Sequence, residues 1–174
     1  MGLKVLGIDP GLADTGVGIV HGTSRHVEGY AFGTVRTTAR EADSARLVHI
    51  YERVSGIVRE QSPDLVVVEE SFSLARYPKS GIQLGKVTGA ILVACGHCGM
   101  PVREVPVRVV KQVLTGNGRA GKAQVEAAVR RELGRTEPIR PSHASDALAL
   151  ALIGLYRGME TLLNESRPAP RETR

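Results

Sequence analysis

The sequence has little aromatic content and no long hydrophobic run. It contains no Trp, two Phe and four Tyr, so any aromatic side chain at the surface would be unusual for this chain. No apolar stretch approaches the roughly 20 residues that a membrane-spanning helix needs. The chain also enters a predicted strand at once, without the basic segment and apolar stretch of a signal peptide. We therefore expect a cytoplasmic protein with no membrane association.

Cysteine is also scarce. The two cysteines, Cys95 and Cys98, form a single C-x-x-C motif with His97 between them. The sequence contains no second pair of the kind that completes a zinc site, although a zinc site or a redox pair remains open. We favour buried, reduced thiols on one face of a helix.

Size and charge indicate one basic globular domain. The chain has 174 residues, of which 42% are hydrophobic, and a formal net charge of +5. This length can bury a full core, and the positive charge favours a polyanionic partner. We expect a single domain over residues 1–160 and a disordered, charged tail over residues 161–174, because the end of the chain is rich in Pro, Arg and Glu.

The hydrophobic pattern predicts an α/β fold with a mixed five-stranded sheet flanked by helices. Three early strands are close enough to form an antiparallel meander, and a β-branched run at Leu65–Val68 is typical of a strand buried on both faces. Between them, Leu47, Val48, Tyr51, Val54 and Val58 recur at helical spacing, with Arg46 among the charged positions on the other side. The expected strands are Leu3–Asp9, Thr15–His21, His26–Arg36, Leu65–Val68 and Pro101–Val107, and the later helices are about 81–99, Val107–Leu114, Lys122–Leu133 and Ser142–Met159.

Acidic residues stand where two of the predicted core strands end. Asp9 precedes a Pro-Gly turn, and Glu69 with Glu70 follows the Leu65–Val68 run. A buried acid without a partner is costly, so such residues need a cation, a donor or a metal. If the two strands are neighbours, their acids meet at one edge of the sheet.

The predicted last helix can add two more ligands to that edge. His143 and Asp146 are three positions apart and project from the same side of a helix. Hard oxygen ligands favour Mg²⁺ or Mn²⁺, and the histidine makes Mn²⁺ more suitable. Two such ions per site could activate water for phosphodiester hydrolysis, a chemistry that suits a basic protein.

Each of these residues also has a structural interpretation. Asp9 could end a strand, the Glu69-Glu70 pair could lie at a solvated strand end, and Asp146 could simply favour the start of its helix. The joint pattern, rather than any single residue, favours a metal-dependent site.

Several motifs together resemble the RuvC family of Holliday-junction resolvases. The resemblance runs from about Leu3 to Tyr156. Its motifs are Gly7-Ile8-Asp9-Pro10-Gly11 followed by Thr15-Gly16 and Gly18, the Glu69-Glu70-Ser71-Phe72 run, Arg108–Val113 with Gln112, and His143–Ala149.

The resemblance implies a ribonuclease-H-like fold and a homodimer with two active sites. It implies paired nicks in a four-way DNA junction during recombination and repair, alongside a junction-binding and branch-migrating helicase complex. By position, Asp9, Glu69 and Asp146 resemble the family's metal-binding carboxylates. His143 stands where family members carry either Asp or His.

Further residues are candidates for DNA contact. Phe72 is similar to an aromatic that the family places near the junction centre, where stacking on a base can contribute about 1–3 kcal/mol. Basic residues around the acidic site could bind phosphates, which fix position without reading sequence. These are Arg76, Lys79, Lys111, Arg119 and Lys122.

Three other functions remain open at this point. The chain could be a ribonuclease-H-like nuclease that acts on RNA, although Phe72 and its basic loop argue against this. It could be an actin-like ATPase, for which the chain is short and lacks a second Asp-x-Gly hairpin. It could also be a non-catalytic DNA-binding module.

Overall fold

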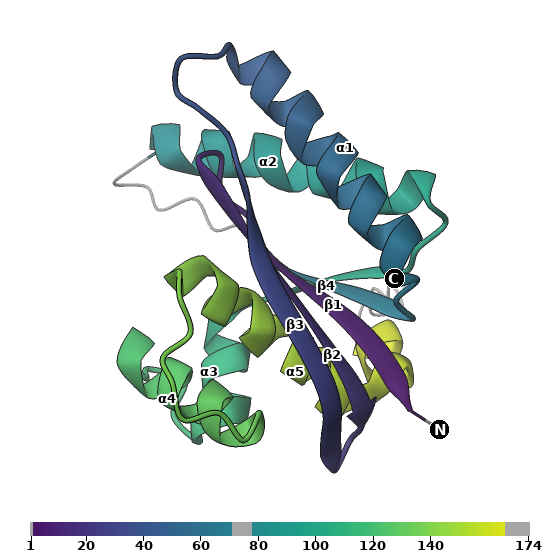
Figure 1. Cartoon of the computed structure of the whole chain (residues 1–174), viewed down its shortest axis with the longest axis vertical. Helices are drawn as coiled ribbons and strands as arrows, with labels where there is room; N and C mark the ends of the chain where they lie inside the picture. The colour runs from purple at the N-terminus through teal and green to yellow at the C-terminus, as the bar shows by residue number, and fades with distance from the viewer. Residues whose placement is uncertain (1, 71–77, 166–174) are drawn as a thin grey trace, which may run out of the picture.

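The protein is built on one five-stranded mixed sheet (Figure 1). The computed structural model describes residues 2–70 and 78–165, with side chains described for residues 79–158 in the second range. The strands are β1 (Leu3–Asp9), β2 (Asp14–Thr23), β3 (His26–Arg36), β4 (Leu65–Glu69) and β5 (Val102–Val105), in the order β3-β2-β1-β4-β5. β1, β2 and β3 pair antiparallel, whereas β4 runs parallel to both β1 and β5. The predicted α/β class and mixed sheet are confirmed.

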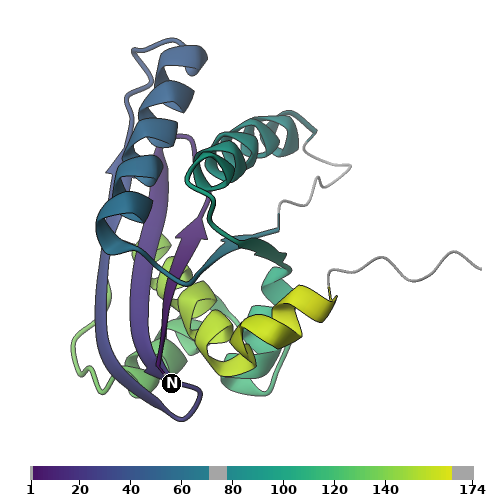
Figure 2. The same ribbon diagram turned by 90° about the vertical axis from the view of Figure 1, so that its right-hand side faces the viewer.

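Helices cover both faces of the sheet (Figures 1 and 2). The later helices, α3, α4 and α5, lie on one face, and α1 and α2 lie on the other. Each layer encloses its own hydrophobic cluster, and alternate residues of β1 and β4 point into opposite clusters, as the strand period requires. Their bounds are α1 Asp43–Gln61, α2 Pro78–His97, α3 Val107–Thr115, α4 Lys122–Glu132 and α5 Ser142–Glu165.

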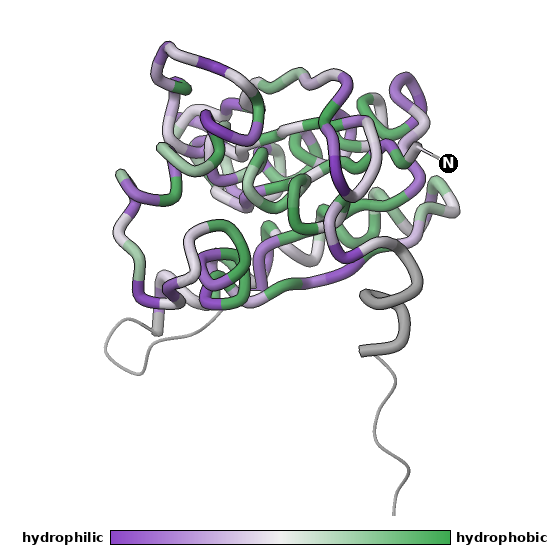
Figure 3. The backbone as a smooth tube through the Cα atoms, turned by 90° about the horizontal axis from the view of Figure 1, so that it is seen from below, coloured by the Kyte–Doolittle hydropathy of each residue, from purple (hydrophilic) through white to green (hydrophobic). Residues whose placement is uncertain are grey.

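The apolar content is concentrated in the interior. Figure 3 shows hydrophobic stretches running through the middle of the molecule and hydrophilic stretches mainly at its outer turns. Most of the inner residues of α5 between Ala144 and Leu155 are buried. Within the described part of the chain, no helix is long and apolar enough to cross a membrane.

Glycines allow α5 to lie very close to β1 and β2. A Cβ on Gly7 would collide with the Ala147 carbonyl oxygen, and a Cβ on Gly18 would lie 2.7 Å from the Leu148 backbone nitrogen. These strands therefore carry no side chain where the helix backbone crosses them. The close approach fixes the start of α5 relative to the ends of β1 and β2.

Two details of α1 differ from the sequence-based expectation. Arg46, predicted on the charged face, is buried, where its Nε donates to Thr37 Oγ1 at 2.8 Å. Val48, predicted on the packed face, is 54% exposed, and Ile50 is buried. Arg46 can be buried because the Thr37 hydroxyl and the nearby Asp43 carboxylate receive its guanidinium.

α5 is the last element of the described chain. It continues to Glu165, with a break in helical geometry at Gly158 (φ 67°). Residues 166–174 of the expected tail lie outside the described residues.

Candidate metal centre

The site begins at the end of β1. Parallel pairing of β1 with β4 places Ile8 opposite Val68, so Asp9 and Glu69 emerge at the same edge of the sheet. The turn after Asp9 is held by Thr15, whose hydroxyl donates to the Gly11 carbonyl at 2.7 Å. The neighbouring strands predicted from the sequence therefore bring two of the predicted acids to one edge.

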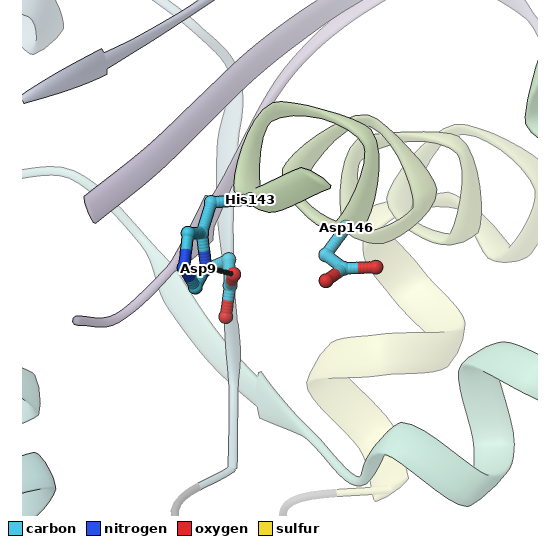
Figure 4. Close-up of side chains that lie close together, drawn as sticks. All are labelled: Asp9, His143 and Asp146. Atoms are coloured by element: carbon cyan, nitrogen blue, oxygen red, sulfur yellow. Dashed lines mark hydrogen bonds and ion pairs between the residues drawn. The ribbon is translucent and has the colours of Figure 1, made fainter. Parts of the chain in front are cut away.

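The first turn of α5 adds His143 and Asp146 (Figure 4). Ligand atoms of Asp9, His143 and Asp146 all lie within 4.8 Å of one another. His143 Nδ1 lies 2.6 Å from Asp9 Oδ2, and because a carboxylate only accepts, Nδ1 carries the hydrogen. Gly16 allows the start of α5 to lie this close to β2, because a Cβ at position 16 would collide with the His143 carbonyl oxygen.

Glu69 faces the same site from its border. It lines a small cleft of about 50 Å³ together with Lys111, Lys122 and Asp146. Glu69 is not part of the 4.8 Å group, although both Asp9 and Asp146 act on it electrostatically. The structure therefore brings three predicted ligands together and places the fourth beside them.

The two acids that end β1 and β4, Asp9 and Glu69, have raised pKa values. Burial raises the pKa of Asp9 above its ordinary value, and the hydrogen bond from His143 opposes this effect. Burial, followed by repulsion from Asp9 and Asp146, raises the pKa of Glu69 to about 7. Burial is the largest cause of both shifts, and it favours the neutral form of Asp9 and Glu69 unless a cation completes the site.

A lysine partly balances the acids. Lys122, at the start of α4, places its Nζ 3.4 Å from Asp146 Oδ2. It also lowers the pKa values of Asp9 and Glu69, but as a smaller effect than burial. Lys122 is 76% exposed in its side chain, so it can also reach a substrate.

The other predicted DNA-binding residues differ in their relation to the site. Lys111 lies on α3 and faces Glu69 in the cleft. Lys79 is exposed in the first turn of α2, and Arg119 is exposed in the loop before α4. Phe72 and Arg76 lie outside the described residues.

The cysteine pair does not form a second metal centre in the described part of the chain. Cys95 is buried, and burial raises the pKa of its thiol to about 12. Cys98 Sγ faces the Ser55 carbonyl at 3.9 Å, and His97 Nδ1 is bonded to the Tyr51 hydroxyl at 3.0 Å. No group of three metal-ligand side chains includes them among the residues described. Cys95 is buried as expected, whereas Cys98 is only partly buried.

Two contacts of the site were not predicted from the sequence. They are the His143–Asp9 hydrogen bond and the Lys122–Asp146 ion pair. The residues were singled out, but both contacts join segments that are far apart in the chain. The sequence places Lys122 at the start of a predicted helix. It does not indicate which element that helix packs against, so it does not reveal the pair with Asp146.

The donor set fits a hard divalent cation. Two carboxylates and an imidazole converge, and a third carboxylate lies at the border of the group. Oxygen ligands suit Mg²⁺ and Mn²⁺, and an imidazole is compatible with Mn²⁺. Burial and the neighbouring acids raise the pKa values of Asp9 and Glu69, and a bound cation would oppose both effects.

Comparison with solved structures confirms the ribonuclease-H-like fold class. Thermus thermophilus RuvC in complex with a Holliday junction substrate is similar, with a TM-score of 0.83 and 36% identity over 91% of this chain and 97% of that chain. The yeast mitochondrial Holliday junction resolvase has a TM-score of 0.60 over 93% of this chain and 82% of that chain. At 9% identity, that likeness concerns the fold alone.

Comparison with known sequences shows the family. The family model described as "Crossover junction endodeoxyribonuclease RuvC" matches residues 5–154. The crossover junction endodeoxyribonuclease RuvC of Syntrophomonas wolfei is 39% identical over 154 residues, which are 88% of this chain and 89% of that protein. With the acidic cluster at the expected edge of the sheet, these matches show that the chain belongs to the RuvC family of crossover junction endodeoxyribonucleases.

Proposed function

We propose that this protein is a metal-dependent endonuclease that resolves four-way DNA junctions by paired, symmetric nicks during recombination and repair. The observation that carries the proposal is the convergence of Asp9, His143 and Asp146 in a chain of this family. Support for the substrate comes from the Thermus thermophilus relative, whose structure contains a Holliday junction.

The metal ligands in this proposal are Asp9, Glu69, His143 and Asp146, which also form the catalytic group. They would hold Mg²⁺ or Mn²⁺, with two ions per site. When bound, such ions supply an activated water and stabilise the leaving oxygen in phosphodiester hydrolysis. Glu69, with a pKa of about 7, must lose its proton before it can act as a ligand.

The lysines beside the cluster position the substrate. Lys111 and Lys122 line the cleft that contains Glu69 and Asp146, and both are cationic. A phosphodiester that approaches the acids would be repelled without these charges. We assign Lys111 and Lys122 to the phosphates near the cut, and Phe72, Arg76, Lys79 and Arg119 to more distant DNA contacts.

The junction has two strands to cut, which favours a two-fold dimer with two sites. The outer faces of α1 and α2 carry exposed apolar side chains: Val48, Ile82 and Val93 are 54%, 63% and 59% exposed. Ile82 and Val93 are eleven residues apart and lie on one face of α2. We place the dimer contact there, and expect Ile82→Glu combined with Val93→Glu to give a monomeric mass in light scattering, where wild type gives a dimer.

The proposed setting is the cytoplasm, with a junction-binding and branch-migrating helicase complex as partner. The DNA substrate and the two free thiols agree with that compartment.

The roles of the acids are tested by separating binding from cleavage. Asp9→Asn and Asp146→Asn should abolish cleavage of a four-way junction in Mg²⁺ or Mn²⁺, and should retain junction binding in a mobility-shift assay. Glu60→Gln, at an exposed acid near the end of α1, is the matched control and should cleave normally. Normal cleavage by both site variants would contradict the assignment of these acids.

A further inference from the structure

A second cavity adjoins the metal centre and has no assigned role. It lies between α4 and the start of α5, is about 300 Å³ in volume, and is closed on its third side by the loop at residues 138–140. Asp146 lines this cavity and also belongs to the metal-ligand cluster. Anything bound in the cavity would therefore lie next to the reacting centre.

Ser145 is one of the residues that line the cavity, and its buried hydroxyl has no hydrogen-bond partner in the described chain. The residue is 3% exposed. A buried hydroxyl without a partner lowers stability, because it has lost its bonds to water and gained none. Since Ser145 has no bond to break, its hydroxyl can turn toward a ligand at little cost.

Basic side chains line two sides of the cavity, beside Asp146 and Glu126. Arg140 lies in the loop that closes it, and Lys122 lies on the α4 side. The first turn of α5 presents the positive end of the helix, which begins at Ser142 and runs to the break at Gly158, and Ser142 adds a second hydroxyl there.

The one acid on the α4 side of the cavity is already neutralised. Glu126 accepts a hydrogen bond from the Ile139 backbone N–H at 3.1 Å and pairs with Arg130 at 3.0 Å. These contacts tie the loop that carries Arg140 to α4. The wall of the cavity is therefore formed before any ligand arrives.

We propose that this cavity is a phosphate subsite that holds a phosphodiester group of the cleaved strand beside the one at the metal centre. Arg140 supplies the charge, the Ser145 and Ser142 hydroxyls donate hydrogen bonds, and Lys122 is shared with Asp146. This inference rests on the proposed nuclease function and adds Arg140, Ser142 and Ser145 as positioning residues.

The hydroxyl is tested with Ser145→Ala. This variant should keep or raise the melting temperature of the free protein, because it removes an unpaired buried hydroxyl. It should bind a four-way junction about tenfold more weakly in the presence of Ca²⁺, a loss typical of one hydrogen bond to a charged group. Ser55→Ala is the matched control, since Ser55 is the other buried serine in the described chain whose hydroxyl has no partner, and it lies on α1. It should leave junction binding unchanged.

The charge is tested with Arg140→Gln and Arg140→Lys. Arg140→Gln loses one phosphate contact and should reduce the slope of log Kd against log salt by about 0.9. Arg140→Lys keeps the charge and should retain the wild-type slope. Arg59→Gln, an exposed change at the end of α1, should keep the wild-type slope.

Neutral methylphosphonate linkages, placed singly on either side of the mapped cut, identify the phosphate. A methylphosphonate at one of these positions should weaken junction binding by wild type. It should not weaken junction binding by Arg140→Gln any further. Inorganic phosphate is the second probe, because a site for a free anion would bind it tightly without DNA.

The outcomes separate this subsite from the proposed function. Suppose that wild type cuts junctions, but that Ser145→Ala and Arg140→Gln do not change junction binding, or that every methylphosphonate weakens Arg140→Gln as much as wild type. The proposed subsite is then wrong, and the proposed nuclease function is unaffected. Tight binding of inorganic phosphate without any methylphosphonate effect would mean that the cavity holds a free anion rather than a DNA phosphate. That result would also overturn the proposed subsite. If wild type neither binds nor cuts junctions, the proposed function fails and the subsite fails with it.

Discussion

Replacing Glu69 with Gln should stabilise the metal-free protein at high pH while impairing metal binding. In the folded protein the pKa of Glu69 is raised from 4.5 to about 7. The folded state therefore holds this proton more tightly than the unfolded state does. Its contribution to stability is fully present below pH 4.5 and is lost as the pH rises through 7. Gln resembles the protonated acid and carries no such dependence.

The size of the effect follows from the shift. One pKa unit corresponds to about 1.36 kcal/mol, so a fully buried group with this shift would lose about 3 kcal/mol. Glu69 is half-buried, and solvent screening reduces the expected loss to about 1–2 kcal/mol. The free energy of unfolding of Glu69→Gln, relative to wild type, should therefore rise by about 1–2 kcal/mol between pH 4.5 and pH 8.

Urea unfolding in EDTA at several pH values measures this difference directly. Added Mn²⁺ should reverse it, because wild type gains stability by binding the ion and Glu69→Gln gains less. Glu70→Gln removes a carboxylate from the neighbouring position and is the control. A relative stability of Glu69→Gln that is the same at pH 4.5 and pH 8 would refute the burial argument.

Three further predictions concern the surroundings of the site. Gly7→Ala should lower stability by about 3 kcal/mol and the melting temperature by about 6–12 °C, because its Cβ collides with α5, whereas Gly56→Ala, with open space around it, should be neutral or stabilising. Lys122→Met should move the acidic limb of the cleavage pH profile to higher pH, since Lys122 lowers the pKa of Glu69; an unmoved limb would remove that role. His143→Asp should shift the metal preference in cleavage assays from Mn²⁺ toward Mg²⁺, and an unchanged preference would show that His143 does not contact the metal.

The sheet edge that carries the site could be predicted because its signals are local. An apolar run that ends in an acid identifies both β1 with Asp9 and β4 with Glu69, and helical spacing pairs His143 with Asp146. These patterns depend on neighbouring residues in the chain.

The contacts that complete the site could not be predicted in the same way. The Lys122–Asp146 pair and the unpartnered Ser145 hydroxyl depend on where α4 lies against α5. Arg46 shows the same limit in α1, since its burial depends partly on Thr37, which lies outside the helix. A long side chain does not reveal its partner through spacing alone.

The most direct test is cleavage of a synthetic mobile four-way DNA junction, in Mg²⁺ and separately in Mn²⁺, beside linear duplex and an RNA–DNA hybrid. Wild type should make paired, symmetric nicks in the junction alone, and Asp146→Asn should make none. Binding without cutting in either metal would contradict the catalytic role of the cluster, and cutting of the RNA strand instead would contradict the junction as substrate.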